Sequence, residues 1–375
     1  MTDPASRIAS EIEEGGPIPF TRFMELALYD PMAGYYAAGR AEIGCRGDYF
    51  TSASVGAVFG ELLAGQFIAA WRELGEPEDF VIVEQGANDG QLAADALGFL
   101  REGPMSKVNW TIIEPFPHLR EKQRETLKDF DVRWVSTPGE LPAFEGIHFS
   151  NELFDALPVH IVRSKGDSWV ELRVALREGR FVWEEASPGD ELGRSIADLP
   201  PRASGYQTEI RLSHRPLLRT LAEKIRRGWV LVIDYGMDAG RLLAHHRTRG
   251  TISCYSRHRR DSNPLESPGA KDITAHVNFS MLASDALQAG FALASFTDQY
   301  HFLTAAAEPL LRSMDGMPPT RESQKKLQSL KTLLHPESMG TQFHYLLLSK
   351  NQTGSLPGFR HAKDPGFLLE AGYGA

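Results

Sequence analysis

Short apolar runs of strand length alternate with helix-forming segments along most of the chain. Residues 80–83 form one such run, and its consecutive apolar positions are typical of a strand buried on both faces. A glycine turn follows at residues 86–90, and residues 91–97 then favour a helix. Strand, turn and helix make the first half of a doubly wound α/β unit, in which a ligand binds where the turn passes the carboxyl end of the strand.

Six later segments have the same strand character, so the pattern predicts an α/β fold with a seven-stranded sheet. These segments are residues 108–115, 131–136, 146–150, 229–234, 291–297 and 343–349. Helices are expected at residues 211–227, 299–311 and 322–333, and in a segment that ends near Gly290.

The chain before the first strand is mostly helical in pattern, and we interpret it as a lid over the sheet. Its expected helices are residues 8–14, 21–28 and 55–74. Polar and apolar residues alternate over residues 159–185, which predicts an antiparallel β-insertion. The predicted organisation is a helical extension (1–75), a core (76–350) and a surface tail (351–375). The core has insertions at about 158–206 and 237–275. Within them, residues 186–206 and 237–274 are expected to be irregular loops.

Composition and charge limit the function classes. The formal net charge of −9 over 375 residues argues against a nucleic-acid surface, which needs a clustered basic face. Cys45 and Cys254 lie far apart without metal-ligand spacing, so they are expected to be small buried residues, and no metal is expected. No apolar run approaches the length of about 18 residues that spans a bilayer. The N-terminus has no targeting pattern, so we expect a cytoplasmic protein without a membrane span.

Glu84 ends the first strand and helps to choose between ligands. A dinucleotide pyrophosphate would bind at the helix N-terminus and is disfavoured by a carboxylate beside it. The sulfonium and ammonium groups of S-adenosylmethionine are cations that a carboxylate attracts. The pattern E-x-G-x-x-x-G, from Glu84 to Gly90, therefore favours a methyltransferase turn over that of a nicotinamide-dependent oxidoreductase. A glycine turn without any ligand is the structural alternative.

Glu114 ends the second strand, 24 residues after Gly90. An acidic residue at about this spacing binds ribose hydroxyls in doubly wound folds. Its two oxygens can accept both hydroxyl protons of a ribose diol. The alternative is an ordinary surface glutamate at a strand end, but Glu84, the turn and Glu114 together predict an adenosyl ligand.

Further polar residues occupy two positions where ligands commonly bind. Asn151, Glu152 and Asp155 follow the fourth strand and are expected at the mouth of the ligand crevice. A helix cap with a solvated Asp155 is the alternative. Gly47, Asp48 and Thr51 belong to a glycine-bounded loop before the helix at residues 55–74, a kind of loop that often binds ligands.

A set of motifs resembles that of one known family. The motifs are GPIPFTRFMELALYDPMAGYY (residues 16–36), GDYFTS (47–52), VEQGANDGQL, SNELFDALPVH, VIDYG, GTISCYSRH, KDITAHVNF and MGTQFHYLLLSK, in this order over roughly residues 16–350. The set is similar to that of the MidA-like family of S-adenosylmethionine-dependent methyltransferases, bacterial and mitochondrial proteins related to the assembly factor of respiratory complex I. The turn in that family usually reads G-x-G-x-G, whereas here Asn88 replaces the middle glycine and Asp89 follows it. Asparagine is the non-glycine residue best able to adopt the left-handed conformation that such a turn needs.

The resemblance implies a class I methyltransferase (Rossmann-like) fold with S-adenosylmethionine as its cofactor. The cofactor-binding residues that it implies are Glu84, Gly86, Asn88, Gly90 and Glu114, together with Gly47, Asp48 and Thr51. The implied reaction is methylation of arginine in a partner protein. Complex I assembly is the setting in relatives, so the implied partner is a subunit of respiratory complex I.

Carboxylates suit an arginine acceptor because they bind its N–H groups bidentately and localise its charge away from the attacking nitrogen. We expect Glu152 to fill this role first and Asp155 second, with Asn151 orienting the cofactor or the acceptor. Further candidates for lining the acceptor site are Asp234, Tyr255 and His276. A non-catalytic assembly or binding protein that retains the fold stays an alternative, because Asn88 and Asp89 add side chains to the turn. The sequence leaves the oligomeric state open.

Overall fold

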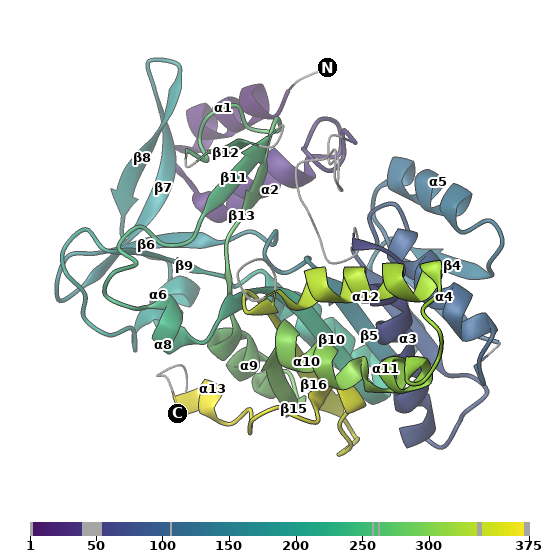
Figure 1. Cartoon of the computed structure of the whole chain (residues 1–375). Helices are drawn as coiled ribbons and strands as arrows, with labels where there is room; N and C mark the ends of the chain where they lie inside the picture. The colour runs from purple at the N-terminus through teal and green to yellow at the C-terminus, as the bar shows by residue number, and fades with distance from the viewer. Residues whose placement is uncertain are drawn as a thin grey trace.

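The predicted strands pair in one large mixed sheet (Figure 1). The structure is a computed structural model, and it describes residues 3–39, 55–105, 107–256, 259–261, 263–335 and 340–370. In spatial order the sheet contains β15 (Ala292–Asp298), β16 (Phe343–Lys350), β10 (Ile225–Met237), β5 (Phe144–Asn151), β2 (Val81–Gln85), β3 (Asn109–Ile113) and β4 (Val132–Val135). The short strand β14 (Val277–Asn278) adds to β10. All seven predicted strands are therefore confirmed within the described residues.

Strand direction explains where a site can form. Strands β10, β5, β2, β3 and β4 run parallel, whereas β16 is antiparallel to both of its neighbours. The carboxyl ends of the five parallel strands therefore lie along one edge of the sheet, where doubly wound folds bind their ligands.

Both faces of the sheet are buried. Along β10, Trp229, Leu231 and Ile233 belong to one apolar cluster, while Val230 and Val232 belong to the other, because successive side chains of a strand point to opposite faces. The first cluster includes residues of α3 (Val58–Glu73), α4 (Gln91–Arg101), α10 (Gln299–Ala306) and α12 (Arg321–Leu334). The second includes residues of α7 (His214–Lys224) and α9 (Phe279–Gln288).

The predicted β-insertion forms a second sheet and has its own cover. This sheet contains β1 (Ile18–Pro19), β7 (Trp169–Arg177), β6 (His160–Ser164) and β9 (Gln207–Ile210), with β8 (Arg180–Ala186) paired to β7. Helices α1 (Pro4–Gly15) and α2 (Phe20–Tyr29) pack on it (Figure 1). The ring centroids of Phe20 and Trp183 are 5.2 Å apart, and those of Phe23 and Phe181 are 5.7 Å apart.

The interpretation of residues 1–75 as a lid over the large sheet is therefore wrong for α1 and α2. A sheet with one apolar face needs a cover, and these two helices supply it for the insertion. Helix α3, at the end of the same segment, instead belongs to the core of the large sheet. Periodicity identified all three helices but could not show which apolar surface each of them covers.

Two segments expected to be irregular contain short elements. Residues 186–206 include α6 (Asp190–Ile196), whose Leu192 and Ile196 are buried. Residues 237–274 include α8 (Ala239–Leu242) and a small sheet in the order β12 (Arg259–Asp261), β11 (Ser253–Ser256) and β13 (Asp272–Thr274). Elements of three to seven residues give almost no periodic signal, so the sequence did not reveal them.

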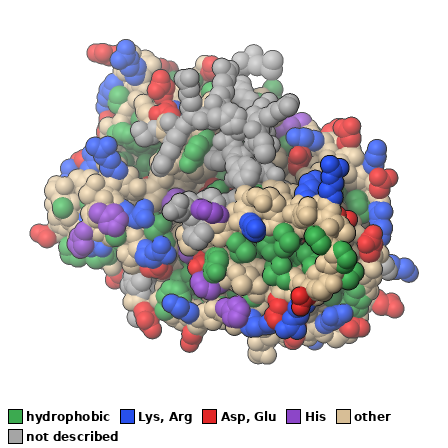
Figure 2. Space-filling view, viewed as in Figure 1, with side chains coloured by type: hydrophobic (Ala, Val, Ile, Leu, Met, Phe, Trp, Pro, Cys, Tyr) green, Lys and Arg blue, Asp and Glu red, His purple; other side chains and the backbone are tan. Residues whose placement is uncertain are grey.

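Two further helices are α5 (Pro117–Thr126), which contacts α4, and α11 (Glu308–Met314), which contacts α10. Figure 2 shows apolar side chains gathered over the region of α10 and α11. Among the described residues of these helices and of the turn after α11, Tyr300, Leu311 and Met317 have exposed side chains. On the rest of this face, acidic and basic side chains are interspersed (Figure 2).

The C-terminal segment contributes to the core instead of only lying on the surface. It contains a 3-10 turn, η4 (Pro357–Phe359), and α13 (Phe367–Glu370). The Trp229 Nε1–H donates to the Gly354 carbonyl oxygen at 3.0 Å. Phe359 is 4% exposed and makes an edge contact with Phe302, with 5.1 Å between the ring centroids.

Removing the Phe359 ring should test this contribution. Phe359→Ala should lower the free energy of unfolding by about 3 kcal/mol, because it leaves a cavity against Phe302. Urea unfolding followed by circular dichroism measures the change. Phe99→Ala removes the same ring from a side chain that is 42% exposed and should cost about 1 kcal/mol or less. An equally small effect at both positions would show that the tail does not stabilise the core.

Candidate active site

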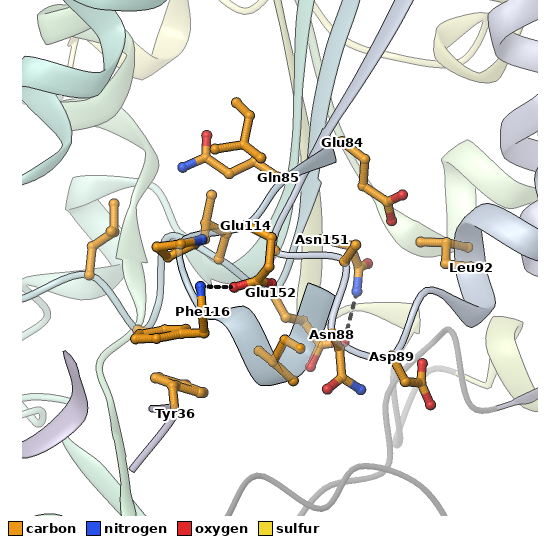
Figure 3. A pocket seen from close by; sticks show the side chains of 18 of the residues that line it. Tyr36, Glu84, Gln85, Asn88, Asp89, Leu92, Glu114, Phe116, Asn151 and Glu152 are labelled. Carbon is orange, nitrogen blue, oxygen red and sulfur yellow. Dashed lines mark hydrogen bonds between the residues drawn. The ribbon is translucent and has the colours of Figure 1, made fainter. Parts of the chain in front are cut away.

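A cavity of about 430 Å³ lies at the carboxyl ends of β2, β3 and β5 (Figure 3). This volume falls in the range of small-molecule sites. The predicted residues that line it are Glu84, Gly86, Asn88, Glu114, Asn151, Glu152 and Asp155. Gly90 is not among the lining residues and instead precedes α4. Gly47, Asp48 and Thr51 lie outside the described residues.

The glycine turn keeps its shape despite the substitution at its centre. Asn88 has φ of +47°, so its expected left-handed conformation is confirmed, and Gly86 and Gly90 have φ of +82° and +83°. A Cβ added at Gly86 would meet Leu153 Cδ1 at 3.3 Å, so the turn approaches the segment after β5 closely. Asp89 Oδ1 accepts a hydrogen bond from the Gln91 N–H at 3.2 Å, at the first residue of α4.

Glu84 is a buried acid at the end of β2, only 2% exposed. Its Oε2 accepts a hydrogen bond from the Trp110 Nε1–H at 3.2 Å. Burial raises the pKa of Glu84 to about 8, and the nearby Asp89 contributes to the shift. The side chain is therefore mostly neutral at pH 7 and would ionise at this pH beside a bound cation.

Glu114, directly after β3, is held by two donors. Its Oε1 accepts from the Phe116 N–H and its Oε2 from Gln123 Nε2, each at 3.0 Å. Burial raises the pKa of Glu114 to about 6. Figure 3 shows Glu114 beside Phe116 in the cavity wall. Each carboxylate oxygen keeps a further lone pair for a ligand hydroxyl.

Gln123 joins the turn to Glu114, a role that the sequence did not suggest. Besides its bond to Glu114, its Nε2 donates to the Asn88 carbonyl oxygen at 2.9 Å, and its Oε1 accepts from the Trp134 Nε1–H at 2.9 Å. Gln123 is completely buried on α5, a helix whose other residues are polar apart from Pro117 and Leu119. Because α5 has no apolar stripe, nothing in its pattern marks Gln123 as a site residue.

The segment after β5 has a strained start. Glu152 has φ of +54°, a conformation that costs a non-glycine residue roughly 1 kcal/mol or more. Its backbone N–H donates to the Ile233 carbonyl oxygen at 2.9 Å, and its Oε1 accepts from Asn151 Nδ2 at 3.1 Å (Figure 3). Strain at a cavity residue is typical of functional positions.

Asp234 supports this segment but does not line the cavity, contrary to its expected role. Its Oδ2 accepts hydrogen bonds from the N–H groups of Leu153, Phe154 and Asp155 at 3.1, 2.7 and 3.3 Å. Its Oδ1 accepts from the Tyr235 N–H at 2.8 Å. Asp234 is fully buried near the end of β10, and the three donors in residues 153–155 fix the backbone that follows Glu152.

The cavity also has a wall that the sequence reasoning missed. Tyr29, Tyr35, Tyr36 and Asp272 line it beside Asp155. They belong to the motifs YDPMAGYY and KDITAHVNF. Because these motifs were part of the family resemblance, they could have indicated these residues as site residues.

Tyr255 and His276 were also expected near the acceptor, but neither is among the described lining residues. Tyr255 lies on β11 and pairs with β12 and β13. The His276 N–H donates to Thr251 Oγ1 at 3.0 Å. Within the described residues, no group of three or more His, Cys, Asp and Glu side chains could hold a metal ion.

A protein family and a solved structure that resemble this chain are both described as methyltransferases. Residues 62–297 match the family described as "Putative S-adenosyl-L-methionine-dependent methyltransferase". A protein from Burkholderia thailandensis, described as a likely methyl transferase and solved with bound S-adenosyl-homocysteine, is 30% identical with a TM-score of 0.87; the match covers 97% of this chain and 96% of that one.

Curated relatives match over a similar length. The mitochondrial protein arginine methyltransferase NDUFAF7 homolog of Drosophila melanogaster is 28% identical over 92% of this chain and 84% of its own. The mitochondrial protein arginine methyltransferase NDUFAF7 of Homo sapiens is 26% identical over 91% of this chain and 82% of its own.

The expected cytoplasmic location was wrong, because these curated relatives are mitochondrial proteins. That expectation rested on the lack of a recognisable targeting pattern near the N-terminus, and such a pattern is separate from the folded part of a protein. Within the described part of the chain, no helix combines the length and the apolar character needed to cross a membrane.

Glu84→Gln should change how stability depends on pH. Because folding raises the pKa of Glu84 from 4.5 to about 8, its contribution to stability is complete below pH 4.5 and is lost as the pH rises through 8. The free energy of unfolding of the wild type should therefore fall relative to that of Glu84→Gln between these values. The slope should reach at most about 1.4 kcal/mol per pH unit.

Urea unfolding at a series of pH values, without ligand, measures this difference. Glu121→Gln alters a glutamate whose side chain is 80% exposed, so its profile should follow that of the wild type. Parallel profiles for the wild type and Glu84→Gln would show that Glu84 titrates normally in the folded protein.

Proposed function

Because the chain belongs to the family of S-adenosyl-L-methionine-dependent methyltransferases, we propose that it transfers a methyl group to an arginine side chain of a partner protein. The observation that carries this proposal is a single cavity lined both by the glycine turn with Glu114 and by Glu152 with Asp155. The relatives named protein arginine methyltransferases support the choice of acceptor. The partner implied by the family resemblance is a subunit of respiratory complex I.

The residues present fit the cofactor. The two carboxylate oxygens of Glu114 can accept hydrogen bonds from the ribose hydroxyls. Each oxygen is held in place by a donor of the protein at 3.0 Å. The apolar lining residues Ile113, Phe116 and Leu119 lie beside Glu114 in the sequence and suit the adenine ring. Glu84 suits the cationic methionine part, since a nearby cation favours its ionised form.

Further residues complete the proposed cofactor site. Gly86 and Asn88 bring the backbone of the turn to the cavity, and Gly90 starts the helix that follows. Gly47, Asp48 and Thr51, outside the described residues, remain part of the proposal. The bound cofactor supplies an electrophilic methyl group.

The acceptor end of the cavity has to bind and orient a guanidinium group, which is protonated in solution. The Glu152 carboxylate, oriented by Asn151 at 3.1 Å, accepts the guanidinium N–H groups and fixes the plane of the acceptor. Asp155 provides a second carboxyl group three residues further on. Fixing the acceptor in this way lowers the entropic part of the barrier to an in-line displacement.

The alternative of a non-catalytic binding protein rested on the altered turn. The left-handed Asn88 and the preserved Gly86 and Gly90 conformations show that the altered turn keeps its shape. Family membership and this turn geometry therefore both favour the enzyme.

Glu152→Gln tests the catalytic role. It should lower the rate of methyl transfer by about 100-fold or more, since the amide cannot localise the acceptor charge. The assay uses tritiated S-adenosylmethionine and recombinant, unmodified subunits of respiratory complex I, followed by hydrolysis and amino-acid analysis. The affinity of Glu152→Gln for S-adenosylhomocysteine should stay within about twofold of the wild type. Label on an amino acid other than arginine would contradict the proposed acceptor.

Glu114→Ala and Gln123→Ala test the cofactor site. Calorimetric titration with S-adenosylhomocysteine should show a dissociation constant about 10-fold or more higher for Glu114→Ala, because hydrogen bonds to a charged group are lost. Gln123→Ala should weaken binding less, because Glu114 remains but loses one of its two donors. Glu121→Gln, on the exposed face of the same helix, is the control. Unchanged binding by Glu114→Ala would exclude Glu114 as the ribose ligand.

A further inference from the structure

Two buried carboxyl groups from distant parts of the chain meet in the cavity. Asp155 follows β5 and Asp272 begins β13; they are 7% and 5% exposed, and both line the cavity. Burial raises the pKa of Asp155 well above its usual range, and the neighbouring Asp234 and Asp272 add to this effect. Burying acidic groups side by side costs stability, and such clusters are characteristic of functional sites.

The buried cation nearby, Arg211, does not satisfy Asp155 Oδ1. Arg211 donates its N–H groups to the backbone carbonyl oxygens of Leu157, His276, Asp155 and Ala275 at 2.8–3.3 Å. Asp155 Oδ1 is buried without a hydrogen-bond partner among the described residues. An unsatisfied buried acceptor costs roughly 1–3 kcal/mol, so Asp155 is suited to receive a donor from a ligand.

Two tyrosines add an aromatic wall. The Tyr36 hydroxyl donates to Asp272 Oδ1 at 2.9 Å, and the Tyr29 hydroxyl donates to the Ala156 carbonyl oxygen at 3.0 Å. The two rings lie 5.4 Å apart with a tilt of 32°, and both line the cavity. Carboxylates beside aromatic rings favour a planar, delocalised cation such as guanidinium, which can stack and hydrogen-bond at the same time.

The order of the strands separates this cluster from the proposed ribose ligand. Glu114 follows β3, the glycine turn follows β2, and Asp155 follows β5. Neighbouring strands lie about 5 Å apart, so the ends of β3 and β5 are separated by about 10 Å. Asp155 therefore lies on the Glu152 side of the cavity, where the acceptor is placed, and the hydrogen bond from the Tyr29 hydroxyl to the Ala156 carbonyl oxygen holds that tyrosine beside it.

We propose that Asp155, Asp272, Tyr29 and Tyr36 form a cation subsite that selects the guanidinium group of the acceptor arginine. This inference rests on the proposed function and extends it to specificity. The N-terminal segment supplies the two tyrosines, the second insertion supplies Asp272, and the segment after β5 supplies Asp155. The N-terminal segment and the second insertion therefore both contribute to the choice of substrate.

The test uses two small probes on the protein saturated with S-adenosylhomocysteine. N-acetyl-arginine amide carries the cation, and N-acetyl-citrulline amide has nearly the same shape without it. Calorimetric titration of the wild type should show at least about 10-fold preference for the arginine probe. Asp272→Asn and Asp155→Asn should each lower affinity for the arginine probe about 10-fold or more and leave affinity for the citrulline probe unchanged. Asp129→Asn, an exposed aspartate, is the matched control.

Affinity for S-adenosylmethionine, which carries both the sulfonium and the ammonium, distinguishes the cofactor from the acceptor as the cation that the cluster binds. It should stay within about twofold of the wild type in Asp272→Asn, which also shows that this variant is folded. A parallel loss of S-adenosylmethionine affinity would assign the cluster to the cofactor and overturn the proposal. Equal binding of the two probes by the wild type, or undiminished arginine affinity in both variants, would also overturn it.

The outcome for the subsite is separable from that for the proposed function. If methylarginine forms on a complex I subunit while Asp272→Asn leaves the KM for that subunit unchanged, only the subsite is wrong. If the label appears on a different amino acid, the proposed acceptor is wrong whatever the probes show. A KM for the subunit raised about 10-fold, with a nearly unchanged kcat, supports the subsite.

Discussion

The carboxylate of Asp234 holds the segment on which the acceptor end of the cavity is built. A buried carboxyl group needs hydrogen-bond partners, and Asp234 accepts four bonds from backbone N–H groups, three of these in residues 153–155. These bonds connect the ends of the adjacent strands β10 and β5. They also stabilise a backbone in which Glu152 adopts φ of +54°. The position of Glu152 in the cavity therefore depends on a residue that does not itself reach the cavity.

Gln123 has the corresponding role at the other end of the cavity. Its amide connects the Asn88 carbonyl oxygen, the Glu114 carboxylate and the Trp134 indole. These contacts fix the turn through its backbone, so a residue other than glycine can occupy its centre without loss of shape. Side chains that are not among the lining residues thus fix both ends of the cavity, through hydrogen bonds between neighbouring strand ends and helices.

The parallel sheet and the segments added to it contribute different parts of the site. The strand ends supply Glu84, Glu114 and Glu152, as expected for a doubly wound fold. The N-terminal segment supplies the tyrosines, and the second insertion supplies Asp272. The helices before the tyrosines share an apolar core with the first insertion and β13, so packing outside the large sheet positions the wall of the cavity. Differences in acceptor specificity between proteins with this sheet can therefore arise in the additions.

The sequence by itself determined the seven strands, the glycine turn and the acids at the strand ends, because each is encoded by a local pattern of a few residues. It also carried the motifs that resemble the methyltransferase family. Only the tertiary structure decided that Gln123 joins the turn to Glu114, that Asp234 holds a backbone segment, and that Asp272 meets Tyr36 across 236 residues of sequence. The physical reason is that a polar side chain takes whichever partner the fold brings within about 3 Å. That choice depends on how distant elements pack, and a local sequence pattern contains no information about their packing.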